Sequence, residues 1–184
     1  KLIGITSINN GNVEVSVEPT LLPHEHPLSQ VKNEYNAVYV YGESVGETMF
    51  YGPGAGSLPT ATAVVSDLME VVKNIRLEIS GNSYVTPQYK TRLKENTEKF
   101  MKYFIRMEAD DQAGTFQEIT NVFSNENVSF EKILQLPANT DKTAEIVMVT
   151  HLVNKQQLLN SLEKLHNLSV VKRMISYYRV DGEE

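Results

Sequence analysis

The stretch FMKYFIRMEADDQAGTFQEITNVF, residues 100–123, contains two hydrophobic periods in succession. Apolar side chains occupy every second position from Met101 to Met107, which predicts a β-strand. Phe116, Ile119, Val122 and Phe123 then recur at helical spacing and mark one face of a helix. Between the two periods lies a short polar loop, residues 110–114. The stretch therefore predicts a strand, a loop and a helix in that order.

The following residues repeat the pattern. Apolar residues predict strands over 128–136 and 144–149, and the turn between them begins at Pro137. Asn154 and Gln157 have the spacing of a capping box, which predicts the start of a second helix whose apolar face is made of leucines. A last strand is expected over 170–180. The order βαββαβ predicts an α+β fold in which two helices cover one face of a four-stranded antiparallel sheet.

The first 98 residues are less regular. Strands are expected over 1–8 and 13–17, where valines alternate with polar residues and predict one buried face. Another strand is expected over 36–41, and a glycine-rich segment spans residues 42–56. A helix with a wide buried face is expected over 59–76. We place the domain boundaries at residues 1–78 and 99–181, with a linker over residues 79–98.

Composition excludes several classes of function. The 184 residues are 41% hydrophobic and 22% charged, and none is cysteine, so disulfides and thiolate zinc sites are excluded. The net charge of −6 without a basic stripe argues against nucleic acid as a partner. No apolar run approaches the ~20 residues needed to span a membrane. A cytoplasmic protein is expected. The chain opens at Lys1 directly in a strand, so we expect it to be a fragment.

A glycine-rich loop at residues 51–57, YGPGAGS, runs into the expected helix at 59–76. Glycines allow a ligand to approach the backbone, and the free N–H groups at a helix start favour an anion or a polar ligand. The spacing is not that of the dinucleotide fingerprint. The alternative is a tight packing turn without a ligand.

A second candidate site is the loop Asp110, Asp111, Gln112, Ala113 and Gly114. Backbone N–H groups at the following helix start can donate to a carboxylate, and an aspartate can accept hydrogen bonds from an ammonium group, so the loop suits a free amino acid. The alternative is simple helix capping by Asp111, or by Thr115 with Glu118. Gln135 and the strand that carries His151 are further candidates to face this loop.

Other polar clusters give weaker evidence for a functional site. His24 and His26 flank Glu25, but a third ligand is not nearby in the sequence, and we assign no metal site. Glu43 and Glu47 are interpreted as exposed loop carboxylates. We assign no catalytic residue in this chain.

Two stretches resemble a known family. Residues 36–40, NAVYV, and 46–61, GETMFYGPGAGSLPTA, closely resemble the end of the catalytic domain of bacterial homoserine dehydrogenase. Residues 19–23, PTLLP, and 26–28, HPL, look like an upstream loop of the same family. Residues 100–181 resemble an ACT domain, whose Asp-x-Pro-Gly pattern corresponds to residues 111–114 with Ala113 in place of proline. The resemblance implies a partial catalytic-domain sheet with a helix, followed by a ferredoxin-like ACT domain.

The resemblance implies a reaction as well. Homoserine dehydrogenases interconvert L-aspartate 4-semialdehyde and L-homoserine with NAD or NADP, on the route to threonine and methionine. In this family the Rossmann domain and the catalytic lysine lie upstream of Lys1, so this chain alone is expected to be inactive. Gly56 matches a position whose backbone lies against the cofactor, whereas Glu47 and Thr48 match the motif without an assigned role.

For the ACT portion, the resemblance implies a homodimer or higher homo-oligomer and an amino-acid effector, with threonine as the first candidate. The effector is expected at the loop of residues 110–114. Two alternatives stay open: a stand-alone amino-acid sensor without enzymatic activity, and an ACT module that only dimerises.

Overall fold

The computed structural model describes residues 1–79, 92–137 and 142–181. They form two compact units. The sheet unit consists of residues 1–23 together with the described residues from 92 onward, and the hairpin–helix unit consists of the described residues from 24 to 79. The two units are described separately below.

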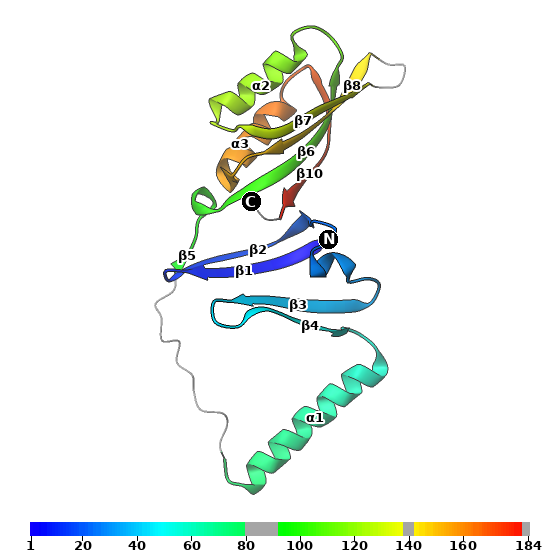
Figure 1. Ribbon diagram of the computed structural model, residues 1–184, viewed down its shortest axis with the longest axis vertical. Coiled ribbons are helices and arrows are strands. Elements are labelled where there is room, and N and C mark those ends of the chain that lie inside the picture. Colours follow the sequence, from blue (N-terminus) through cyan, green and yellow to red (C-terminus); the bar gives the residue numbers. More distant parts are fainter. Residues whose placement is uncertain (80–91, 138–141, 182–184) are drawn as a thin grey trace. The chain divides into compact units, whose positions relative to one another are not determined.

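The last six main elements of the sheet unit confirm the predicted order βαββαβ. They are β6 (Phe100–Asp110), α2 (Thr115–Asn125), β7 (Phe130–Pro137), β8 (Thr143–Thr150), α3 (Lys155–His166) and β10 (Val171–Val180). Their strands are ordered β10-β6-β8-β7, and all three pairings are antiparallel. Figure 1 shows α2 and α3 together on one face of these strands. This is the ferredoxin-like arrangement, and we call it the βαββαβ module.

The core of the module lies between the sheet and its helices. The alternating residues Met101, Tyr103, Ile105 and Met107 of β6 are at most 4% exposed. The helices contribute their own buried faces, with Ile119 and Phe123 from α2 and Leu158 and Leu165 from α3. The period of two in the strand and the period of 3.6 in the helices therefore meet in one apolar layer, as the sequence predicted.

The predicted capping box begins α3. The short strand β9 (Val153–Asn154) pairs with the start of β6. At its end the Gln157 N–H donates to Asn154 Oδ1 at 2.9 Å, and the Asn154 N–H donates to Gln157 Oε1 at 3.2 Å. Two N–H groups that the helix leaves unpaired are satisfied in this way.

Replacing Asn154 with alanine is expected to lower the free energy of unfolding by about 1 kcal/mol, because the Gln157 N–H loses its acceptor. Urea unfolding followed by circular dichroism measures this difference. Asn121→Ala, at an exposed position within α2, is the control and is expected to change stability by less than about 0.5 kcal/mol. Equal losses in both variants would contradict the assigned role of the cap.

An N-terminal hairpin extends the sheet of the module. It consists of β1 (Leu2–Asn9) and β2 (Asn12–Leu21), which turn at Asn10 and Gly11, both with positive φ. The end of β2 runs parallel to the end of β10, where Thr20 and Leu21 pair with Arg179 and Val180. One continuous sheet, ordered β1-β2-β10-β6-β8-β7, therefore joins both parts of the sheet unit.

The buried face of β2 is the opposite of the one that the sequence suggested. Val15 and Val17 are 45% and 71% exposed, whereas Glu14 and Thr20 are 8% and 1% exposed. The reason is the pairing with β10: Thr20 lies opposite Arg179, so the polar side chains of β2 share the face of the sheet that the helices cover. Glu14 is paired there with Lys94 at 3.2 Å.

The end of the segment expected as a linker is structured. The strand β5 (Arg92–Leu93) pairs with β2, and the 3₁₀ helix η2 (Asn96–Glu98) follows it. The Arg92 guanidinium donates to both oxygens of the Glu98 carboxylate at 2.8 and 2.7 Å, and the Glu95 N–H donates to it at 3.0 Å. Residues 80–91 lie outside the described residues.

These hydrogen bonds, with that of Arg92 as the largest cause, lower the pKa of Glu98 to about 2. Because the folded pKa lies below the ordinary value of about 4.3, the pair stabilises the fold above that value and loses its contribution as the pH falls toward 2. A carbon-detected NMR titration is expected to give Glu98 a midpoint near 2, and Arg92→Gln is expected to shift it upward. Arg173→Gln is the control, and a Glu98 midpoint that Arg92→Gln leaves in place would contradict the assignment.

The hairpin–helix unit contains η1 (Pro27–Gln30), β3 (Tyr35–Gly42), β4 (Gly46–Pro53) and α1 (Ser57–Arg76). β3 and the helix were predicted. The glycine-rich segment 42–56 was not predicted to contain a strand, yet its middle forms β4, paired with β3 along its length. The strand was missed because glycine usually indicates a turn or loop. Gly46 does supply the positive φ of the turn, but Gly52 lies within the strand near its end.

α1 is helical as expected, but none of its side chains is buried. Its apolar residues, among them Val65, Leu68 and Val72, are about half exposed. The described part of this unit holds one hairpin and one helix, which is too little to cover an apolar helical face. Among the helices that the structure describes, none combines the length and the apolarity required to cross a membrane.

Candidate functional site

The glycine-rich turn at residues 52–56 connects β4 to α1. A Cβ atom on Gly54 would lie 1.4 Å from Asn36 Nδ2, so any side chain here would overlap with β3. Gly56 has φ 131° and ψ 147°, a region that only glycine adopts readily. Two of these glycines are therefore required by the fold, each for a different reason.

The turn is open to solvent. Residues 53–57 are exposed, and Gly56 is the N-cap of α1 without a side-chain cap. The N–H groups of Ser57 and Leu58 at the start of α1 are thus left available, whereas Pro59 has no N–H and the Thr60 N–H donates to Gly56 O at 3.1 Å. The exposed N–H groups of an uncapped helix start can bind a polar or anionic group of a ligand. Gly54 also fits the alternative of a tight packing turn, because it lies against Asn36.

The loop of residues 110–114 starts α2 without a side-chain cap. Gly114 is the N-cap with φ 97°, and neither Asp111 nor Thr115 accepts a hydrogen bond from the helix start. The alternative of simple side-chain capping is therefore wrong. Thr115 is instead 4% exposed, and its Oγ1 is buried without a hydrogen-bond partner among the described residues.

Both aspartates of this loop already have donors. Asp110 lies 2.7 Å from Lys172 Nζ, and Asp111 accepts from Gln135 Nε2 at 3.1 Å. Gln135 therefore faces the loop as the sequence suggested. His151 lies beyond the other end of β8, next to Ser129 at 3.1 Å. The loop retains exposed backbone N–H groups over residues 112–114, but a ligand ammonium would have to share its carboxylates with Lys172 or Gln135.

The histidine pair has a local structural role. The Leu28 N–H donates to His26 Nδ1 at 3.1 Å, so His26 caps η1, and its ring packs on Tyr39. Within residues 1–79, 92–137 and 142–181, His, Asp and Glu side chains do not gather in a group that could hold a metal ion. Glu43 and Glu47 are exposed.

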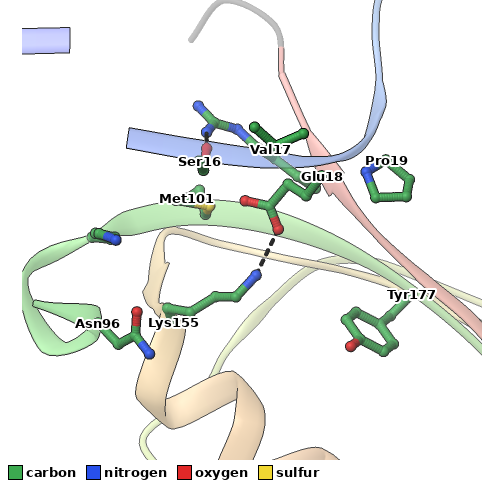
Figure 2. A pocket seen from close by; sticks show the side chains of 10 residues that line it. Ser16, Val17, Glu18, Pro19, Asn96, Met101, Lys155 and Tyr177 are labelled. Carbon is green, nitrogen blue, oxygen red and sulfur yellow. Dashed lines mark hydrogen bonds and ion pairs between the residues drawn. The ribbon is translucent and has the colours of Figure 1, made fainter. Parts of the chain in front are cut away.

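A pocket that the sequence did not reveal lies between β2 and the βαββαβ module. Its volume is about 320 Å³, and its polar lining includes Ser16, Glu18, Asn96, Lys99, Lys155 and Arg179. We call it the seam pocket. Figure 2 shows the Lys155 ammonium directed at the Glu18 carboxylate, with Asn96 and Tyr177 at the sides. The signal was present in the alternating polar residues of β2, which were taken to face solvent.

The seam pocket borders a buried phenol. Tyr103 is 0% exposed, and Lys155 Nζ lies 5.2 Å from the centre of its ring. Burial is the main cause that raises the pKa of Tyr103, and the charge of Glu18 raises it further while Arg179 opposes this. The phenol is therefore neutral and can only donate or accept hydrogen bonds here.

The comparisons with known proteins match two family models in succession along the chain. A family model for homoserine dehydrogenase matches residues 1–69, and a model for the ACT domain matches residues 103–170. Homoserine dehydrogenase of Bacillus subtilis is 56% identical over 183 residues, which are 99% of this chain and 42% of that protein. Homoserine dehydrogenase of Helicobacter pylori is 36% identical over 171 residues, which are 93% of this chain and 40% of that protein.

Solved structures of homoserine dehydrogenases are also similar to this chain. The crystal structure of a homoserine dehydrogenase from Thiobacillus denitrificans matches 98% of this chain and 42% of its own, with a TM-score of 0.81 and 27% identity. That of S. aureus homoserine dehydrogenase at pH 6.0 matches 100% of this chain and 42% of its own, with a TM-score of 0.57 and 32% identity. The chain thus spans about two fifths of the length of the relatives that it matches.

Proposed function

Since the chain belongs to the homoserine dehydrogenase family through residues 1–69 and carries an ACT domain over residues 103–170, we propose that it serves that enzyme as the end of its catalytic domain together with a regulatory module. The proposed reaction is the NAD- or NADP-dependent interconversion of L-aspartate 4-semialdehyde and L-homoserine, in threonine and methionine biosynthesis. The proposed location is the cytoplasm.

The glycine-rich turn is the observation that carries this proposal. Gly56 combines a φ that only glycine adopts readily with an exposed position at an uncapped helix start. A side chain at this position would cover the backbone that the turn presents. We assign Gly56 to the cofactor, where its backbone lies against the nucleotide, and no residue of this chain to the chemical step.

The ACT domain is assigned a regulatory role. We propose that two copies associate and that an amino acid, with threonine as the first candidate, binds at the loop of residues 110–114. The exposed N–H groups of residues 112–114 and the glycine N-cap of α2 support this. Feedback control requires that the effector bind one arrangement of the subunits more tightly, typically by about 1–3 kcal/mol. The proposed boundaries are residues 1–78 for the catalytic part and 99–181 for the ACT domain.

The experiment compares two proteins, the 184-residue chain and the product of the complete gene. Reduction of NADP or NAD in the presence of homoserine is followed at 340 nm. We expect turnover by the gene product and none by the 184-residue chain, whose sequence lacks the G-x-G-x-x-G fingerprint. A gene product without turnover would refute the enzyme assignment, and turnover by the 184-residue chain would refute its assignment as a part that is inactive alone.

The same preparation tests the effector. Threonine is expected to bind the 184-residue chain in calorimetry, and Gly114→Val is expected to weaken that binding at least tenfold, because a β-branched side chain is strained at φ 97°. Gly52→Ala is the control, since its Cβ would meet no atom within 4 Å. The absence of heat with threonine, isoleucine, valine and methionine would instead favour a module that only dimerises.

A further inference from the structure

The charge of the seam pocket is opposite to that of the chain. The chain carries a net charge of −6, whereas three cations, Lys99, Lys155 and Arg179, line the pocket together with a single carboxylate, Glu18. A concave site lined by one sign of charge raises the local concentration of counter-ions. The pocket is therefore suited to an anion.

Glu18 neutralises only one of the three cations. Its carboxylate lies 2.6 Å from Lys155 Nζ, and the two side chains are 15% and 21% exposed, which indicates a firmly held pair. Among the residues that the structure describes, Lys99 Nζ contacts only the carbonyl oxygen of Val15, at the long distance of 3.5 Å. Lys99 and Arg179 thus retain most of their capacity to bind an anion.

Arg179 is the cation whose hydrogen-bond donors are least satisfied by the described residues. Its side chain is 12% exposed, and its nearest carboxylate, Asp181, lies 3.8 Å away, beyond hydrogen-bonding distance. One terminal nitrogen donates to Ser16 Oγ at 3.3 Å, and among the described residues the Nε–H group is buried without a partner. Buried polar groups are nearly always paired, because an unpaired one keeps the cost of its lost hydration.

A second unpaired group lies beside it. Tyr103 is the register partner of Arg179, so both side chains share the face of the sheet that the helices cover. The Tyr103 hydroxyl is also buried without a partner among the residues that the structure describes. Both donors lack an acceptor among the described residues, and one of them, Arg179, lines the cationic pocket, which indicates that a ligand supplies oxygen atoms there.

We propose that the seam pocket binds a small oxyanion, a phosphate or a carboxylate group, with Arg179 as its main partner and Lys99 at the rim. A volume of about 320 Å³ is at the lower end for ligand pockets and admits a small metabolite. The site lies at the start of β6, whereas the loop of residues 110–114 follows its end. The inference goes beyond the proposed function and does not depend on redox activity.

The location has a consequence for coupling. One wall of the seam pocket is β2, which belongs to the homoserine dehydrogenase part, and the remaining walls belong to η2, β6, α3 and β10. An anion held by Arg179 and Lys99 at this place stabilises the contact between the two parts of the sheet unit. Its binding therefore raises the unfolding midpoint of the chain.

The test uses inorganic phosphate and malonate as probes on the 184-residue chain, by calorimetry and by thermal unfolding at constant ionic strength. We expect saturable binding of at least one probe and a Kd that rises at least tenfold in Arg179→Gln. Arg173→Gln removes the same charge from the same strand at a side chain that is 69% exposed, and it is expected to leave the Kd unchanged. Binding of only one probe identifies phosphate or carboxylate as the group recognised.

Two results would overturn the proposal: no saturable binding of either probe, or equal losses in Arg179→Gln and Arg173→Gln. Circular dichroism verifies that the variants are folded. If Arg179→Gln does not fold, Lys99→Gln replaces it, and an unchanged Kd in that variant would equally refute the site. Homoserine oxidation by the complete gene product is unaffected by either outcome, so the two proposals fail separately.

Discussion

Replacing Phe123 with alanine is expected to lower the free energy of unfolding of the βαββαβ module by about 3–5 kcal/mol. Phe123 of α2 is 0% exposed, and its ring meets Phe130 of β7 edge to face, with 4.8 Å between the ring centres. Truncation removes this contact and leaves a cavity between the helices and the sheet. Urea unfolding followed by circular dichroism measures the loss.

Phe116 provides the matched control, because it lies on the same helix and is 39% exposed. Phe116→Ala is expected to cost about 1–2 kcal/mol, clearly less than Phe123→Ala, because part of its surface stays in water and its truncation leaves no enclosed cavity. Similar losses in the two variants would show that α2 does not pack on the sheet by the face assigned to it. A typical domain is stable by about 5–15 kcal/mol, so Phe123→Ala removes a large share of the total.

Replacing Gly56 with alanine is expected to lower kcat/KM of the complete gene product by about ten- to hundredfold. The backbone conformation at φ 131° costs a residue with a Cβ about 1–3 kcal/mol. The added Cβ would also lie 3.3 Å from Pro59 Cδ, within the first turn of α1. The turn relaxes by moving the backbone that we assign to the cofactor, so we expect the KM for NADP or NAD to rise.

Gly52→Ala is the control within the same turn. Gly52 does not have a positive φ, and a Cβ there would meet no heavy atom within 4 Å, so wild-type kinetics are expected. Wild-type kinetics in Gly56→Ala would remove the cofactor assignment. Circular dichroism of both variants separates an altered turn from a loss of folding.

Local patterns were sufficient to predict the βαββαβ module. Alternation in β6 and the capping box at Asn154 are signals within a few residues, and the pairing of four amphipathic strands under two helices follows from them. The hydrophobic pattern gave the wrong buried face where pairing with a strand distant in sequence decides which face of the sheet is covered. β2 reads as a strand with buried valines, but its pairing with β10 buries Glu14 and Thr20 instead.

The candidate sites likewise divide into those with a local sequence signal and one without it. The turn at Gly56 and the loop at Gly114 were predicted, because glycine before a helix has a local meaning and the structure gives both residues positive φ. The seam pocket was not predicted, since Glu18, Lys155 and Arg179 come from three separate elements and Lys99 comes from the connection between η2 and β6. The spacing of charges in the sequence does not predict such a site. The pairing of β2 with β10 brings Glu18 close to Arg179, and the Lys155 N–H donates to Lys99 O at 3.0 Å.

That parallel pairing also has the fewest register pairs between neighbours in the strand order β1-β2-β10-β6-β8-β7. Only two register pairs join β2 to β10, with one further hydrogen bond from the Asp181 N–H to Leu21 O at 2.9 Å, whereas β6 and β8 are paired over seven residues. Local breathing of a protein begins where few backbone bonds must break. The junction between the N-terminal hairpin and the ferredoxin-like layer is therefore expected to open before that layer does, and its opening also breaks the Glu18–Lys155 pair.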